Sequence, residues 1–242
     1  YVKNIKLFSD NSLRSYSYDL NDYISFCYKQ YSEINFKKLD HIVIQSYMKY
    51  LSKQGLNSRT LARRLATIKS FYGFMFSNNF IKTNYSKFVK TPKLDKKLPH
   101  YLSLEEAKEI LTLPVGDSEN SLRDRLILEL FYSTGIRISE LIKIKLFDIN
   151  LDEKMITIIG KGNKERIAII GKEAFQALLT YLPMIRDKGS NYLFPPLRKR
   201  NNKTISSKTV YNIVKKYLKI VSNDNKLSPH SLRHAFATHM LN

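Results

Sequence analysis

The stretch L-S-P-H-S-L-R-H-A-F-A-T-H-M-L occupies residues 227–241 and carries the strongest signal in this chain. Ser228-Pro229 is typical of a helix start, because Pro suits the first helical turn. His230 and Arg233 are three residues apart and therefore share one face of this predicted helix. The helix dipole at His230 favours an anion, and Arg233 can donate two hydrogen bonds to phosphate oxygens. The stretch predicts a phosphate-binding helix start; a plain surface helix terminus is the alternative.

A second stretch, T-G-I-R-I-S-E-L at residues 134–141, places Arg137 and Glu140 at the same spacing. Gly135 breaks the chain between two predicted helices, the second running from about Arg137 to Ile144. Backbone N–H groups at a helix start favour anions, and Glu140 could hold the Arg137 guanidinium in place. Taken alone, this pattern is more typical of an ordinary surface Arg–Glu pair.

Two β-branched runs, M-I-T-I-I-G and E-R-I-A-I-I-G, flank K-G-N-K at residues 161–164 and predict a β-hairpin. Lys161 lies between two glycines at the predicted tip, from which its ammonium group could enter a cleft as a general acid. A solvated turn is the alternative. We expect Lys164 and Arg166 to face solvent or a phosphate backbone.

Charge points to a polyanionic partner. The 242 residues carry 41 Lys+Arg against 21 Asp+Glu, a formal net charge of +20. Residues 1–100 hold 18 basic and 6 acidic side chains, which leaves 23 and 15 for residues 101–242, so both halves are basic. A nucleic acid that touches both halves explains this distribution, because each neutralised phosphate releases counterions. A merely basic protein is the alternative, and an anionic membrane is a weaker one.

The location expected from sequence is cytoplasmic. No run of eighteen apolar residues is present, and the start Y-V-K-N-I-K lacks the apolar core of a signal peptide. Cys27 is the single cysteine, which fits a reducing compartment and a small buried apolar side chain.

The first ninety residues predict helices: one within residues 12–31, a second over Ile42–Lys53, and a third from Arg59 to about Phe76. Ser58 is the expected cap of the third helix. A short fourth element is expected near Asn84–Phe88.

The third helix is a candidate nucleic-acid contact. Its basic and polar residues lie beside an apolar stripe without acidic residues in the same helix, and they are Arg59, Thr60, Arg63, Arg64 and Lys69. Such a helix could enter a groove and contact phosphates or base edges. A solvated charged face is the alternative.

Residues 91–99, T-P-K-L-D-K-K-L-P, predict a linker because two prolines bracket charged residues without periodicity. We therefore expect a helical domain over residues 1–91, a linker over 92–100 and a mixed α+β domain over 101–242. The second domain should begin with a Ser103–Glu106 capping box and include helices over Arg123–Tyr132, Lys172–Arg186, Ser206–Val221 and from Pro229 onward.

A zinc site on His230, His234 and His239 is disfavoured, because no H-E-x-x-H pattern is present and Arg233 would repel a cation. We expect neither a metal nor another cofactor.

Three motifs in this order resemble the tyrosine recombinases (phage integrase family), the Xer type in particular: residues 134–141, I-I-G-K-G-N-K-E-R at 158–166, and 227–242. The S-R-T-L-A-R-R-L-A-T-I-K-S-F-Y run at 58–72 resembles the core-binding helix of that family. The resemblance implies a two-domain, mainly α fold. A four-helix, SAM-like core-binding domain and an α+β catalytic domain with a small hairpin sheet would form a C-shaped clamp around double-stranded DNA.

The resemblance also implies residue roles. In this family, a tyrosine hydroxyl attacks a DNA phosphodiester and forms a 3′-phosphotyrosine. This covalent link stores the energy of the broken bond, so the reaction needs neither nucleotide hydrolysis nor a metal. By this resemblance Arg137 and Arg233 clamp the nonbridging oxygens and Lys161 protonates the leaving 5′-oxygen. His230 assists proton transfer or binds the phosphate, and Glu140 supports these residues. Assembly as a tetramer on two DNA sites is also implied.

One departure concerns the nucleophile. In the family, a further His or Trp and then the nucleophilic Tyr follow the HxxR helix, and none of the sixteen tyrosines here stands in that context. The 242 residues are therefore expected to bind DNA without cleaving it. Chromosome dimer resolution, linked to chromosome partition and cell division, is the leading interpretation. DNA integration or transposition by a mobile element, a non-catalytic DNA-binding protein, and an unrelated RNA- or phosphate-binding enzyme are the alternatives.

Overall fold

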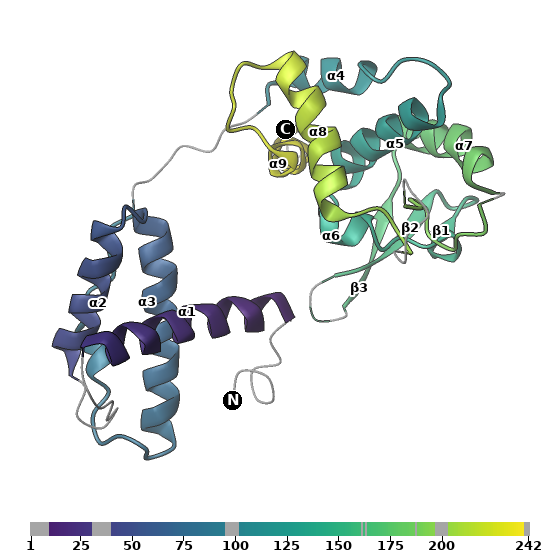
Figure 1. Cartoon of the computed structure of the whole chain (residues 1–242). Helices are drawn as coiled ribbons and strands as arrows, with labels where there is room; N and C mark the ends of the chain where they lie inside the picture. The colour runs from purple at the N-terminus through teal and green to yellow at the C-terminus, as the bar shows by residue number, and fades with distance from the viewer. Residues whose placement is uncertain are drawn as a thin grey trace. The chain divides into compact units, whose positions relative to one another are not determined.

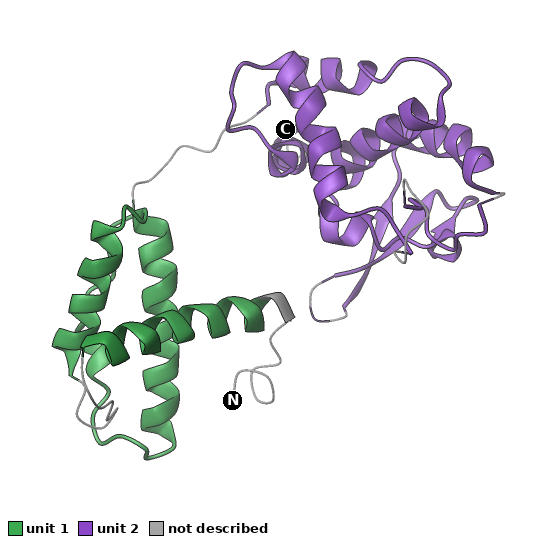
Figure 2. Cartoon of the chain, viewed as in Figure 1, with its two compact units in different colours: residues 1–97 green, residues 98–242 purple. Residues whose placement is uncertain are grey.

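A computed structural model of the chain describes residues 10–30, 40–94, 102–160, 162, 164–186, 188–196 and 203–239. The chain divides into two compact units, residues 1–97 and 98–242 (Figure 2). The predicted linker at 92–100 falls where the two units meet in sequence, and residues 95–100 lie outside the described part. The predicted domain limits therefore stay a prediction.

Unit 1 is helical, as predicted. Helix α1 (Asp10–Gln30) lies across α2 (His41–Lys53) and α3 (Ser58–Ser77), and a 3₁₀ turn, η1 (Tyr85–Phe88), follows (Figure 1). The cap of α3 is Asn57 rather than Ser58: its side-chain oxygen accepts from the N–H of Thr60 at 2.8 Å. Ser58 is the first helical residue instead. The core gathers apolar and aromatic side chains of all three helices, among them Tyr23, Ile44, Tyr47, Leu65, Ile68 and Tyr72.

Two arginines of α3 have acidic partners on α1. The sequence of α3 by itself does not show these partners. Asp19 is 1% exposed and accepts from the Arg63 guanidinium and, at 3.1 Å, from the Thr67 hydroxyl. Arg64 is only 8% exposed and pairs with Asp22. The expectation of an unopposed basic face therefore needs correction at these two arginines. Tertiary packing brings carboxylates that no local spacing reveals.

Unit 2 is built around α5 (Glu119–Thr134), which contacts α4 (Leu104–Thr112), α7 (Lys172–Arg186), α8 (Ser207–Val221) and α9 (Pro229–His239). Helix α5 is apolar on several faces, and a helix of this kind is stable only when surrounded. Its buried residues include Leu122, Leu126, Ile127, Leu128, Leu130 and Phe131. The capping box of Ser103 with Glu106 at the start of α4 is confirmed.

The predicted hairpin is confirmed as β2 (Met155–Ile159) and β3 (Glu165–Ile169), with β1 (Ile149–Asn150) added to give an antiparallel sheet in the order β1-β2-β3. The register pairs Ile158 with Arg166 and Ile156 with Ala168. Arg166 therefore shares the face of the sheet that turns toward the core.

The helix predicted from Arg137 to Ile144 is reduced to the single turn α6 (Ile138–Leu141). The following residues pair with a distant extended segment: the N–H of Leu193 donates to Ile144 O at 2.9 Å, and that of Leu146 to Asn191 O at 2.8 Å. These hydrogen bonds satisfy backbone groups that a longer helix would have used. Next comes the 3₁₀ turn η2 (Leu146–Asp148).

No helix in the described part of the chain has both the length and the apolar character needed to cross a membrane.

Candidate active site

Two predicted motifs meet in unit 2 at a hollow of about 500 Å³, which we call the arginine hollow. Arg137 reaches it from the segment between α5 and α6, and His230 and Arg233 reach it from the first turns of α9. The start of α8 adds Lys208 and Tyr211. The fold thus brings together three of the four basic residues to which the resemblance assigns catalytic roles, Arg137, His230 and Arg233.

Arg137 owes its position to the backbone before it. Gly135 ends α5 in the left-handed conformation, with φ of 56°, and its N–H donates to Phe131 O at 3.1 Å. A side chain at this position would be strained and would also meet the ring of Phe236 on α9, at 2.4 Å from a Cβ. The left-handed backbone of Gly135 turns the chain just before Arg137, and its missing side chain lets α9 approach closely.

Glu140 organises the arginines. Its carboxylate is buried, accepts from the Arg137 guanidinium at 2.6 Å and from the Arg137 backbone N–H at 3.0 Å, and accepts from Arg166 at 3.0 Å. Burial alone would raise the pKa of the Glu140 carboxyl, but these charge-assisted hydrogen bonds outweigh it and lower the pKa. Glu140 therefore stays ionised and fixes Arg137 to strand β3 through Arg166.

Arg233 is held by the chain segment just before Arg137. Its guanidinium donates to the backbone carbonyl of Gly135. Desolvation lowers the pKa of Arg233, and the positive charges of Arg137 and Arg166 lower it further. Three guanidinium groups against the single Glu140 carboxylate leave a net charge of +2, which suits an anion that gains charge during a reaction.

His230 is exposed at the rim of the arginine hollow. Lys161 lies outside the described residues. Lys164, three residues later, is exposed. Its carbonyl accepts a hydrogen bond from the N–H of Gly160 at 2.7 Å, at the base of the hairpin loop. The helix predicted to start near Arg137 does start there, with Arg137 as its N-cap, but α6 is a single turn and the Arg137 N–H donates to Glu140. The guanidinium carries the positive charge at this position.

The residues predicted to contact nucleic acid from α3 differ in exposure. Arg59 is exposed, and Thr60 and Lys69 are half-buried. The Arg63 side chain is 47% exposed although it is paired with Asp19, whereas Arg64 is buried in its contacts with Asp22 and the Tyr47 hydroxyl. Arg59 is therefore the best-placed of these residues for an external partner.

Sequence analysis missed Arg166 as part of the site, and it did not identify Lys208. The alternation of strand β3 could have revealed Arg166, because it shares a face with Ala168, a buried position. No local signal marks Lys208, which follows the Ser206 cap of α8. Its place at the arginine hollow depends on how α8 packs.

Comparison with known proteins agrees with this architecture. The model of the phage integrase family matches residues 100–242, and that of the phage integrase N-terminal SAM-like domain matches residues 1–79. The chain belongs to the phage integrase family, the tyrosine recombinases. The resemblance inferred from the three motifs is thereby confirmed.

The similarity to curated relatives extends over the whole of this chain. Tyrosine recombinase XerC of Thermodesulfovibrio yellowstonii is 36% identical over 246 residues, covering 100% of this chain and 80% of that protein. Tyrosine recombinase XerD of Staphylococcus saprophyticus is also 36% identical, over 250 residues, covering 100% of this chain and 83% of that protein.

Solved structures share the fold. The XerH site-specific recombinase bound to its palindromic difH substrate has a TM-score of 0.77 at 20% identity, covering 95% of this chain and 68% of that one. The Tn1549 transposon integrase in complex with circular intermediate DNA has a TM-score of 0.72 at 18% identity, covering 100% and 84%. The two-domain, mainly helical fold with a small sheet is thus confirmed.

Proposed function

We propose that this chain binds double-stranded DNA and forms the core-binding and catalytic parts of a site-specific recombinase of the Xer type. The observation that carries the proposal is the convergence of Arg137, His230 and Arg233 on one hollow. Similarity to two Xer recombinases over the whole of this chain and the net charge of +20 support it.

In the proposed reaction, a DNA phosphodiester occupies the arginine hollow with its nonbridging oxygens toward Arg137 and Arg233. A tyrosine hydroxyl attacks phosphorus, the P–O5′ bond breaks, and a 3′-phosphotyrosine forms. Lys161 supplies the proton to the leaving 5′-oxygen, and His230 accepts the proton that the tyrosine hydroxyl loses as it attacks. Glu140 keeps Arg137 oriented as charge builds on the phosphorane, and the second half of the reaction reverses these steps with a new 5′-hydroxyl.

DNA contact outside the reacting phosphate is assigned to Arg59, Thr60, Arg63 and Lys69 on α3, and to Lys164 beside the hairpin loop. Arg64 is left out of this set because its guanidinium is buried between α1, α2 and α3. The active assembly is proposed to be a tetramer on two DNA sites, in the cytoplasm.

Chromosome dimer resolution is favoured over integration of a mobile element, because relatives that are 36% identical over the whole of this chain carry Xer names. The two roles differ in outcome. A resolving recombinase should excise the segment between two identical, directly repeated sites on one plasmid, whereas an integrase should join two unlike sites.

The decisive experiment traps a covalent intermediate. The natural protein that carries these 242 residues is mixed with a nicked duplex of a sequence enriched by the protein from a random pool. We expect a covalent protein–DNA adduct that resists denaturation. Arg137→Ala and Arg233→Ala should abolish it, because each removes a charged hydrogen-bond donor to the transition state.

Arg186→Ala is the matched control, since this arginine is exposed in the last turn of α7 and away from the arginine hollow. Adduct formation by both the Arg137 and Arg233 variants at the wild-type rate would contradict the proposed roles. Separately, affinity of the 242-residue chain for duplex DNA should fall steeply with rising salt. Salt-independent binding would argue against a phosphate-dominated interface.

A further inference from the structure

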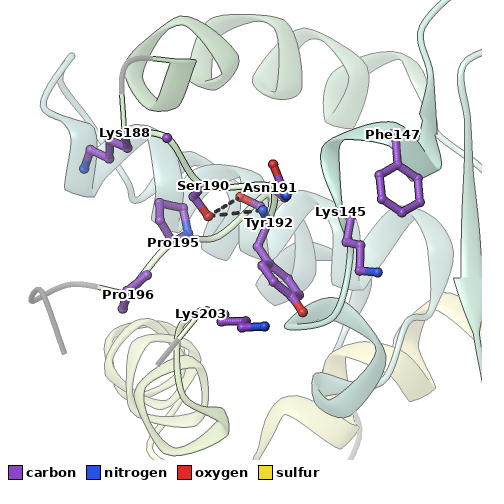
Figure 3. A pocket seen from close by; sticks show the side chains of 10 residues that line it. Lys145, Phe147, Lys188, Ser190, Asn191, Tyr192, Pro195, Pro196 and Lys203 are labelled. Atoms are coloured by element: carbon purple, nitrogen blue, oxygen red, sulfur yellow. Dashed lines mark hydrogen bonds between the residues drawn. The ribbon is translucent and has the colours of Figure 1, made fainter. Parts of the chain in front are cut away.

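A second hollow in unit 2, of about 660 Å³, lies beside the segment that shortened α6. Two stretches form it, Lys145–Phe147 and Lys188–Pro196, together with Lys203 before α8. We call it the lysine hollow. Figure 3 shows its side chains, with the ring of Tyr192 between Lys145 and Lys203 in this view.

The lysine hollow has a fixed backbone frame. Lys145 and Tyr192 form an antiparallel bridge, flanked by the hydrogen bonds from Leu146 to Asn191 and from Leu193 to Ile144. The hydroxyl of Ser190 accepts from the N–H of Tyr192 at 3.1 Å, as the dashed lines in Figure 3 indicate. A preorganised frame lowers the entropy lost when a ligand binds.

Its charge is positive. None of the described residues that line the lysine hollow is acidic. Lys188 is already paired with Glu119 at 2.6 Å, whereas Lys145 and Lys203 form no ion pair within the described part of the chain. The Lys145 ammonium lies 4.9 Å from the centroid of the exposed Phe147 ring, which restricts its position. Two cations on a rigid, open frame suit a phosphate group.

The lysine hollow is also near the arginine hollow. Lys203 precedes Ser207, a residue lining the arginine hollow, by four residues, and four residues span at most about 14 Å. One strand of duplex DNA advances about 3.4 Å per nucleotide along the axis. Lys203 therefore lies no farther from Ser207 than about four nucleotide steps of one strand, which places a neighbouring phosphate of such a duplex near Lys203.

We propose that the lysine hollow is a second phosphate-binding site on the catalytic unit. Lys145 and Lys203 bind a backbone phosphate of the same duplex whose scissile phosphate occupies the arginine hollow, and Tyr192 forms the wall between them. This inference rests on the proposed function and adds a contact that fixes the register of the DNA strand. A free phosphate has the same chemistry, so the test separates the two sources.

The test uses the 242-residue chain and the duplex enriched from a random pool. Single backbone phosphates are neutralised by ethylation, and the positions that block binding are mapped for wild type, Arg137→Gln and the double variant Lys145→Gln/Lys203→Gln. We expect wild type to show two groups of sensitive phosphates, about four nucleotides apart or fewer. The double variant should lose one group and Arg137→Gln the other.

The salt dependence gives a second readout. The slope of log affinity against log salt should decrease by about 1 in the double variant, because it removes one phosphate contact. Lys219→Gln is the matched control, because Lys219 is an exposed lysine in the last turn of α8, far along the helix from Ser207. Its footprint and slope should be those of wild type.

The outcomes are distinct. If the double variant keeps both groups of sensitive phosphates and the wild-type slope while Arg137→Gln loses its group, the inference fails and the proposed function stands. If no protein, wild type included, shows any sensitive phosphate, the proposed function fails.

Inorganic phosphate is titrated separately while the amide NMR signals of Ser190, Asn191 and Tyr192 are followed. Saturable binding that the double variant abolishes, with an unchanged DNA footprint, would assign the hollow to free phosphate and overturn its assignment to DNA.

Discussion

The guanidinium of Arg233 donates a hydrogen bond to the backbone carbonyl of Gly135, 98 residues earlier in the chain. This contact ties the start of α9 to the turn that presents Arg137. Because Gly135 also accommodates the ring of Phe236, one glycine controls both the spacing of α5 and α9 and the distance between the two arginines. The arrangement of the arginine hollow therefore depends on backbone geometry as much as on charge.

Replacing Gly135 with alanine should destabilise unit 2. The left-handed backbone costs about 1–2 kcal/mol for a residue with a Cβ, and displacing Phe236 adds about 1–3 kcal/mol. Gly116→Ala is the control, since Gly116 also has positive φ, 91°, but nothing lies within 4 Å of the place that an added Cβ would occupy. Urea unfolding should show a clearly larger loss for Gly135→Ala, and equal losses would contradict the close approach of α9.

Arg166 should act as a positioning residue. Arg166→Met removes one charged hydrogen bond to Glu140, worth about 1.5–3 kcal/mol, and frees Arg137 to move with Glu140. We expect adduct formation by the natural protein to slow by a factor of about 10 to 100, with partial rescue by Arg166→Lys. Arg186→Met, which removes an exposed arginine charge from α7, should leave the rate unchanged.

A double-mutant cycle separates positioning from general destabilisation. If Arg166 acts through Glu140, then Arg166→Met should add little to the effect of Glu140→Gln on the rate. Additive losses, or equal slowing by Arg186→Met, would show that Arg166 has no specific link to the arginine hollow.

Glu129 on α5 should make stability fall as pH rises toward neutrality. Burial raises its pKa to about 7, and the nearby Glu173 contributes in the same direction. The folded state therefore keeps the proton that the unfolded chain releases above its ordinary pKa of 4.5. The free energy of unfolding should decrease between these two pKa values, by about 3 kcal/mol at most, and level off above them.

Glu129→Gln should remove this part of the pH dependence, as measured by urea unfolding at a series of pH values. Glu109→Gln, which replaces an exposed acid on α4, should retain it. A pH profile of Glu129→Gln that matches wild type would show that Glu129 titrates normally.

Two arginines of α3 should have opposite phenotypes. Arg64→Met leaves the Asp22 carboxylate and the Tyr47 hydroxyl without their shared partner, and we expect unit 1 to lose about 2–4 kcal/mol. Arg59→Gln should leave stability within about 0.5 kcal/mol of wild type but weaken DNA binding and reduce the salt slope by about 1. Loss of DNA affinity without loss of stability in Arg64→Met would reverse this assignment.

Local patterns were sufficient for much of the fold. The helix limits of α2 and α7, the capping box at Ser103 and the β2–β3 hairpin each depend on neighbours within a few residues, and such interactions are encoded in adjacent sequence. The cap of α3 was misplaced by one residue, and α6 by several, because the pairing of residues 144–146 with 191–193 replaced hydrogen bonds that a longer helix would have made.

By itself the sequence determined the family and the basic character of both halves, because motif order and residue type are read without coordinates. It also supplied the candidate catalytic set of Arg137, Glu140, Lys161, His230 and Arg233. Only the tertiary structure decided which charges are available. It buried Arg64 against Asp22, attached Arg166 to Glu140, and brought Lys145 and Lys203 into the lining of one hollow. The physical reason is that a charge's role depends on which opposite charges lie within a few ångströms, and packing between distant segments sets that distance.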